Sequence, residues 1–307
     1  MADKPTVRKN NRSLYRLFLR PGPFVLVALG IAATAIVPTI ISELPHLSFR
    51  SEYRLTRDAV VVTPGPPDWV PEAFLTQIID GELWPVEGTS MLEETLVGQI
   101  AGAFAAHPWV AEVVRVERRF PARVMVKVKY RRPVAWIEVP GQSIPVDVTG
   151  VCLPKEDLAV SDSSRYPLVR GVVSQPPSQV GVAWDDPGLL AAARLARELG
   201  PHWESFGLSA IVVQRRDEEP AVDDRVFLQM LTRGGSRVVW GRPPGTRHPG
   251  ELTVAQKLGR LKQFISYFDS LDPPQGPYEI NIRHWREIIY RRLGSESAQR
   301  MRLPVIR

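Results

Sequence analysis

Cysteine and histidine are scarce in this sequence, and those present are not grouped. The single cysteine, Cys152, excludes a disulfide framework and any metal site built from several cysteines. The five histidines are scattered, and no H-E-x-x-H motif occurs. P-loop, G-x-G-x-x-G and G-x-S-x-G motifs are also missing. The sequence therefore predicts no metal, no cofactor, no small-molecule substrate and no catalytic residues, and so a protein that is not an enzyme.

A uniformly basic surface is missing as well. The net charge is +6, but residues 1–20 contain six cations and one acid. The remaining 287 residues carry 33 cations and 32 acids, so the basic character belongs to a short N-terminal segment rather than to a nucleic-acid-binding face. The length of 307 residues and a hydrophobic content of 44% indicate two folded units of ordinary globular composition.

An uncharged run of 22 residues, 21–42, follows the basic segment. As a helix it would be about 33 Å long, enough for a hydrocarbon core of about 30 Å. The cationic flank predicts an N-terminus in the cytoplasm and an extracytoplasmic location for everything after residue 42. A cleaved signal peptide is the alternative, since Ala33-Thr34-Ala35 resembles an A-x-A cleavage site.

The next segment, residues 53–131, has the pattern of a compact domain with the order strand, helix, helix, strand, strand. Ser90 and Glu93 form a capping box, which predicts that the second helix begins there, with Leu92 on its apolar face. The last strand alternates valines with charged residues, so one sheet face should pack on the helices and the other should face water. The five elements are expected at residues 59–63, 68–79, 90–107, 110–118 and 122–130. In the fourth, Val114 and Val116 are expected to share a face with Val110.

Residues 132–290 have the pattern of a β-rich domain with two helices. Asp185 or Asp186 should cap a helix that ends at Gly200, and a second helix is expected over residues 253–271. A closing strand is expected at residues 278–283. The predicted fold class is thus α+β: a single N-terminal transmembrane helix, a small first domain and a β-rich second domain.

The segment HPWVAEVVRVERRFPARVMVKVKYRRPVAW, residues 107–136, resembles the POTRA signature of the bacterial division proteins FtsQ and DivIB. Later segments are similar to that family in the same order, from a V-D-x-x-G-like turn at 146–150 to a closing strand at 278–283. The first domain departs from the pattern at Tyr130, which replaces the usual glutamate, and at Pro64-Gly65-Pro66, which replaces Gly-Asn. In the closing strand, Asn281 and His284 replace the family's Asp and Tyr. The matching first-domain residues are Pro108, Trp109, Val110, Arg118, Pro121, Arg131, Pro133, Val134 and Ala135. The second-domain matches are Gly235, Val238, Gly241, Lys257, Arg260, Leu261, Ile280, Ile282 and Arg283.

The resemblance implies a non-enzymatic membrane scaffold of the cell-division machinery. It would sit as a single-pass protein in the cytoplasmic (inner) membrane and recruit FtsB- and FtsL-like proteins to the septum. Recruitment would use β-strand augmentation, in which a partner strand pairs with an exposed sheet edge. By the family's pattern that edge follows the closing strand, and the partner-binding residues are expected to be Arg283, Trp285, Ile288 and Tyr290.

Three further interpretations remain open from the sequence. Arg123, Lys127 and Lys129 form a cationic stripe that could contact anionic lipid or an acidic partner, or could simply be the wet face of a sheet. A POTRA-containing envelope assembly or protein-translocation component is the alternative function, although no internal repeat is present. The basic C-terminal segment, residues 291–307, is expected to be disordered without a partner.

Overall fold

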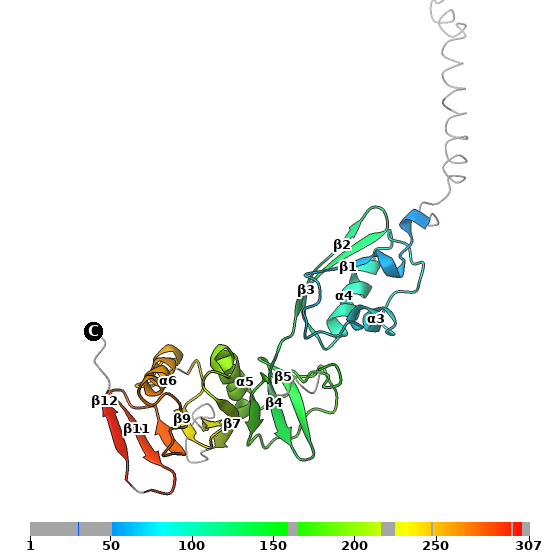
Figure 1. Ribbon diagram of the computed structural model, residues 1–307. Coiled ribbons are helices and arrows are strands. Elements are labelled where there is room, and N and C mark those ends of the chain that lie inside the picture. Colours follow the sequence, from blue (N-terminus) through cyan, green and yellow to red (C-terminus); the bar gives the residue numbers. More distant parts are fainter. Residues whose placement is uncertain are drawn as a thin grey trace, which may run out of the picture.

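The computed structural model contains two α+β domains joined end to end (Figure 1). The first combines a three-stranded mixed sheet with two helices, and the second combines a nine-stranded mixed sheet with two more. The structure describes Gly30 and residues 51–158, 165–215, 225–246, 248–295 and 297–302.

In the first domain the sheet order is β1-β3-β2, with β1 parallel and β2 antiparallel to β3. The valines of β3 at positions 124, 126 and 128 are buried against α4, while Arg123, Lys127 and Lys129 are exposed. The predicted alternation of this strand is therefore confirmed. The elements are β1 (Val60–Thr63), α3 (Phe74–Ile79), α4 (Leu96–Ala106), β2 (Val110–Arg119) and β3 (Arg123–Tyr130).

The second helix of this domain begins later than the capping-box pattern predicted. Ser90 does not cap α4 but forms an isolated bridge with Arg54, and its hydroxyl accepts a hydrogen bond from the Leu92 backbone N–H at 3.3 Å. Helix α4 begins only at Leu96, so Leu92 lies outside the helix and is 49% exposed. Pairing with residue 54, which lies far away in the sequence, overrides the local signal.

Strand β2 also departs from its expected periodicity. Its pairing with β3 is shifted between Val110 and Glu112 and again between Val113 and Arg115. Irregularities of this kind exchange the faces of the residues that follow them. As a result Val113 and Val116 are half-buried, whereas Val114, which was expected to face the core, is exposed.

The second domain is built on one sheet of order β12-β11-β10-β9-β8-β7-β6-β4-β5. Helices α5 and α6 pack on the same face and share one hydrophobic core with the strands (Figure 1). The strands are β4 (Pro133–Val139), β5 (Gln142–Asp147), β6 (Leu168–Arg170), β7 (Leu208–Arg215), β8 (Val226–Thr232), β9 (Arg237–Gly241), β10 (Tyr278–Asn281), β11 (Glu287–Arg292) and β12 (Gln299–Arg302). The helices are α5 (Pro187–Leu199) and α6 (Val254–Phe268).

Both helices of the second domain begin at the residues that the sequence indicated. The Asp186 carboxylate accepts a hydrogen bond from the Leu189 backbone N–H at 2.9 Å, with Pro187 at the first turn. Thr253 and Gln256 form a reciprocal capping box at the start of α6. These caps satisfy N–H groups that would otherwise lack partners, and so they fix where each helix starts.

The predicted fold class requires a correction. The structure is α+β, but none of the four α-helices among the described residues has both the length and the apolarity to cross a membrane. The longest, α6, has 15 residues, which span about 22 Å against a hydrocarbon core of about 30 Å. The inclusion of a transmembrane helix in the fold is therefore wrong for the described chain, and the proposed span, residues 21–42, lies outside it apart from Gly30.

The two domains meet in a packed junction rather than at a bare linker. Trp109 of the first domain is fully buried, and its indole N–H donates to the Asp157 carboxylate of the second domain at 2.7 Å. Arg131 forms an ion pair with the buried Asp147 at 2.8 Å. Trp136, from β4, belongs to the hydrophobic cluster of the first domain. The predicted boundary near residue 131 therefore lies inside a shared contact region.

Candidate partner-binding edge

The last three strands form one end of the nine-stranded sheet, shown in orange and red in Figure 1. Strand β11 pairs antiparallel with β10 on one side and with β12 on the other. The outer side of β12 pairs with no strand among the described residues. An unpaired strand edge presents backbone N–H and C=O groups that another chain can bind. This edge is the candidate site.

The face of this edge that is turned toward α6 is apolar and aromatic. Ile288 of β11 is fully buried, and its neighbour across the strand pair, Met301 of β12, packs on the same core. The Tyr290 ring lies against Phe264 and Phe268 of α6, with centroids 5.6 and 5.4 Å away. Burial, together with nearby Tyr278, raises the pKa of Tyr290, so its hydroxyl stays neutral.

The opposite face of the same strands is charged. Arg291 pairs with Glu279 of β10 at 3.1 Å, and Arg300 of β12 lies 3.8 Å from Glu287 of β11. Arg302 is exposed beside them on the outermost strand. The free edge therefore has an apolar side and a cationic side, which alternate along β12 because successive strand residues point to opposite faces.

Two buried cations of α6 hold the chain that leads into this edge. The Arg260 guanidinium donates to the backbone carbonyls of Ile282 and Trp285, each at 2.7 Å, and its burial lowers its pKa. One turn earlier, Lys257 pairs with Glu251 and donates to the Trp240 carbonyl at 2.8 Å. Burial also lowers the pKa of Lys257, partly offset by Glu251. Sequence reasoning assigned these two residues only as motif matches and missed this role. Lys257 and Arg260 lie three residues apart in a predicted helix and next to Leu261 of its apolar face. This spacing could have indicated that both cations are turned toward the core.

The structure separates the four residues predicted to bind a partner. Trp285 is 63% exposed at the β10–β11 connection. Ile288 is fully buried and is not available to a partner in this conformation, whereas Tyr290 is half-buried with its ring against Phe268 of α6. Arg283 is half-buried and donates to the Asn281 side chain at 3.2 Å. The alternating apolar residues of 288–290 point inward because they extend the core of the sheet.

The predicted edge at residues 285–290 is itself covered by a strand. Residues 299–302, which fall in the segment expected to be disordered, form β12 and pair with β11 over four residue pairs. This is a correction: the available edge lies one strand further along the chain. The residues after 302 lie outside the described chain.

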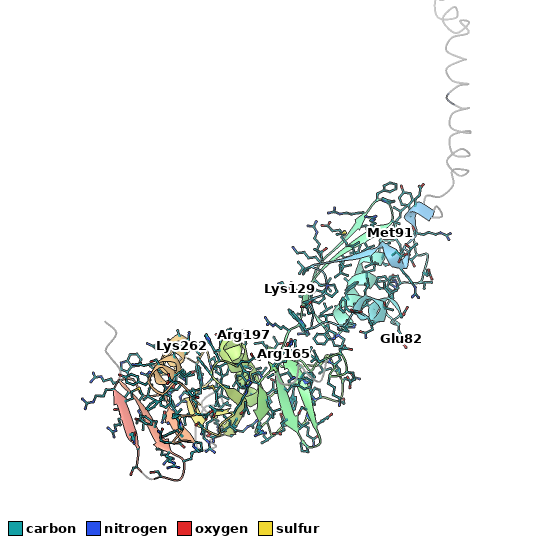
Figure 2. All side chains as sticks on the ribbon, viewed as in Figure 1. Glu82, Met91, Lys129, Arg165, Arg197 and Lys262 are labelled. Carbon is teal, nitrogen blue, oxygen red and sulfur yellow. The ribbon has the colours of Figure 1, made fainter. Side chains whose placement is uncertain are left out.

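The cationic stripe of β3 is less uniform than its sequence suggested. Lys129 pairs with Glu112 of β2 at 2.6 Å and lies at the end of the first domain that faces the second (Figure 2). Arg115 and Arg119 both pair with Glu117, and hydrogen bonding from Arg119 together with the charge of Arg115 lowers the pKa of that carboxyl. Within the stripe, the charge of Lys129 is therefore neutralised by Glu112, and on the neighbouring strand β2 Glu117 offsets part of the charge of Arg115 and Arg119.

Arg123 and Lys127 remain exposed and form no ion pair with any residue that the structure describes. They are separated along β3, with Arg123 at the hairpin turn and Lys127 four residues further on. The sequence-predicted stripe is thus divided into a neutralised part near the junction and a cationic part near the turn.

The metal-ligating and thiol side chains in the described part of the chain do not form a second candidate site. No group of three or more histidine, cysteine or acidic side chains lies close enough there to hold a metal ion. Cys152 is buried, and burial together with the negative charge of Asp147 raises its pKa to about 11, so it carries no thiolate at neutral pH. The acidic stretch at 217–224 lies outside the described residues.

Comparison with known proteins adds no relative to this picture. No protein-family model matches the chain, and no curated protein matches it.

Proposed function

We propose that this chain is a non-enzymatic scaffold of the FtsQ/DivIB type that recruits other division proteins. The observation that carries the proposal is the outer edge of β12, unpaired within the described chain and standing at the end of a nine-stranded sheet. The ordered set of sequence similarities, from Pro108 to Arg283, supports the choice of family. The partners would be FtsB- and FtsL-like membrane proteins.

The mechanism would be β-strand augmentation. A partner strand pairing with β12 would gain backbone hydrogen bonds along the edge. Its side chains would alternate between the apolar side next to Met301 and α6 and the cationic side next to Arg300 and Arg302. The partner segment that fits best therefore alternates apolar and acidic residues. Trp285, exposed near the same end of β11, could contribute a further apolar contact.

The proposed location is the cytoplasmic membrane, with the described domains on its outer side. This part of the proposal rests on the basic segment 1–20 and the uncharged run 21–42 in the sequence. A reporter that is active only outside the cytoplasm should work when fused after residue 307 and fail when fused before residue 1. Recovery of a soluble form that begins near Ile36 would instead show that the run is a cleaved signal peptide.

The edge mechanism can be tested with prolines at alternate positions of β12. In an antiparallel strand, the backbone N–H groups point by turns toward the neighbour and away from it. Gln299→Pro and Met301→Pro therefore form one set, and Arg300→Pro and Arg302→Pro form the other. The set that removes outward N–H groups should abolish co-purification of the division partners while β11–β12 pairing survives.

The other set serves as the matched control, because it removes N–H groups used within the chain. It should loosen β12, seen as faster hydrogen exchange of β11 amides. If neither set reduces co-purification, recruitment does not use this edge.

A further inference from the structure

The turn between β2 and β3 carries an exposed aromatic ring at the far end of the first domain. Phe120 is 71% exposed, and its ring contacts Tyr53 with centroids 5.7 Å apart. This turn, residues 115–123, is called the hairpin tip below. Figure 2 shows Met91, whose carbonyl accepts from Arg118 of the tip, at the opposite end of the domain from Lys129. A single exposed aromatic side chain is ordinary on a protein surface, and the charges around Phe120 and its position in the chain distinguish it from the others.

Cations surround this ring. Residues 115–123 contain four arginines and one acid, Glu117, which pairs with Arg115 and Arg119. Arg118 is held by neutral acceptors, the carbonyls of Met91 and Glu93 at 2.9 and 3.0 Å, so its charge is not cancelled by those bonds. Two further acids have backbone contacts with the tip, Glu52 through Ala122 and Glu93 through Arg118, so the four arginines face three acids in all. The tip thus keeps a net positive charge around an apolar centre.

The chain enters the first domain beside this tip. The Ala122 backbone N–H donates to the Glu52 carbonyl at 3.0 Å, which ties the turn to residues 51–53. The uncharged run ends at residue 42, nine residues before Ser51. Nine residues reach at most about 30 Å. If the run lies in the membrane, the tip is therefore the part of the described chain that is tethered within reach of the lipid surface.

We propose that the hairpin tip docks on an anionic lipid surface, with Phe120 in the headgroup region and the arginines on lipid phosphates. Interfacial binding of this kind combines buried apolar area with attraction between cationic side chains and anionic headgroups. The contact would orient the two domains relative to the membrane and so set the direction in which the β12 edge points. The inference rests on the proposed membrane location.

The test places a polarity-sensitive fluorophore at the tip of the full chain through Phe120→Cys. The native Cys152 is buried with a pKa raised to about 11 and should react slowly with the fluorophore. Labelling of the parent chain, in which Cys152 is the single cysteine, measures this background. The protein is reconstituted in vesicles containing phosphatidylglycerol or only phosphatidylcholine. Val173→Cys in the second domain, also 71% exposed, is the matched control position.

In anionic vesicles, emission from position 120 should shift to the blue and be quenched by spin-labelled lipid, while position 173 should not respond. Arg119→Gln and Arg123→Gln should each reduce the ratio of docked to undocked molecules about fivefold. Arg197→Gln on α5 should have no effect. High salt should also weaken docking, since it shortens the range of the attraction.

A chain that fails to float with vesicles would refute the proposed location. A chain that floats, with the same emission from position 120 in both lipids, would refute the tip contact alone. A response that needs an added division partner would instead assign the tip to an acidic protein surface, and it would overturn the lipid proposal.

Discussion

Truncation of Val126 tests how the first domain is held together. Val126 is fully buried on β3, paired with Val62 of β1 and Val116 of β2, and it belongs to the cluster that contains Leu96 and Ile100 of α4. Val126→Ala removes two methyl groups, worth about 1.6 kcal/mol of transfer free energy, and leaves a cavity as well. The expected loss is about 2–3 kcal/mol in the free energy of unfolding.

For a domain of about 80 residues, this loss lowers the melting temperature by roughly 10–20 °C. Scanning calorimetry of the full chain measures it as the shift of the first-domain transition. Val126→Asp should unfold the domain, because an unpaired carboxylate in this core costs several kcal/mol. Lys127→Ala, one exposed position along, should change stability by no more than about 0.5 kcal/mol. Equal losses at positions 126 and 127 would refute the strand register, since a slip of one residue exchanges the two faces.

Two other predictions concern the edge and the junction. Ile288→Ala should lower the free energy of unfolding by about 2–5 kcal/mol, because this side chain is fully buried. Trp285→Ala should leave the melting temperature nearly unchanged and weaken co-purification of the partners. The reverse pattern would contradict the placement of β11. Burial lowers the pKa of His107 below 6.5, an effect that Asp157 partly offsets, and His107 Nδ1 accepts a hydrogen bond from the Trp109 backbone N–H at 3.4 Å. As the pH falls through 6.5 the unfolded chain takes up the proton first, so stability should decrease below that pH until the folded chain is protonated too, and the decrease should be smaller in His107→Gln. An identical pH dependence of melting in both proteins would refute that assignment.

Much of the fold was predictable where local signals agree with tertiary packing. The alternation of Val124, Val126 and Val128 with charged residues identified the buried face of β3 correctly. The cap at Asp186 also marked the start of α5, because a side chain that bonds its own helix start is a local feature. Such signals need no knowledge of the rest of the chain.

The errors come from contacts between residues distant in sequence. Ser90 was diverted from its expected capping role by pairing with Arg54, and the irregular pairing of β2 reversed the orientation of Val114. A pattern confined to neighbouring residues contains no information on either event. The predicted transmembrane helix was inferred from composition alone, and the described helices offer no counterpart.

The candidate site was only partly predictable for the same reason. The sequence indicated the correct end of the second domain, but Ile288 and Tyr290 were taken for exposed residues of a free edge. Apolar residues at alternate positions are equally typical of a core strand and of a binding strand. Only the structure shows that Ile288 is buried and Tyr290 half-buried, and that residues 299–302 pair with β11 and form the outer strand.

Hydrogen exchange of the full chain, with and without its FtsB- and FtsL-like partners, tests the recruiting edge most directly. Backbone amides on the outer side of β12, residues 299–302, are unpaired within the described chain and should exchange fast in the free protein. Binding by strand augmentation should protect alternate amides of this strand and leave β5, at the other end of the sheet, unchanged. Partner binding that leaves the exchange of residues 299–302 unaltered would contradict the proposed mechanism.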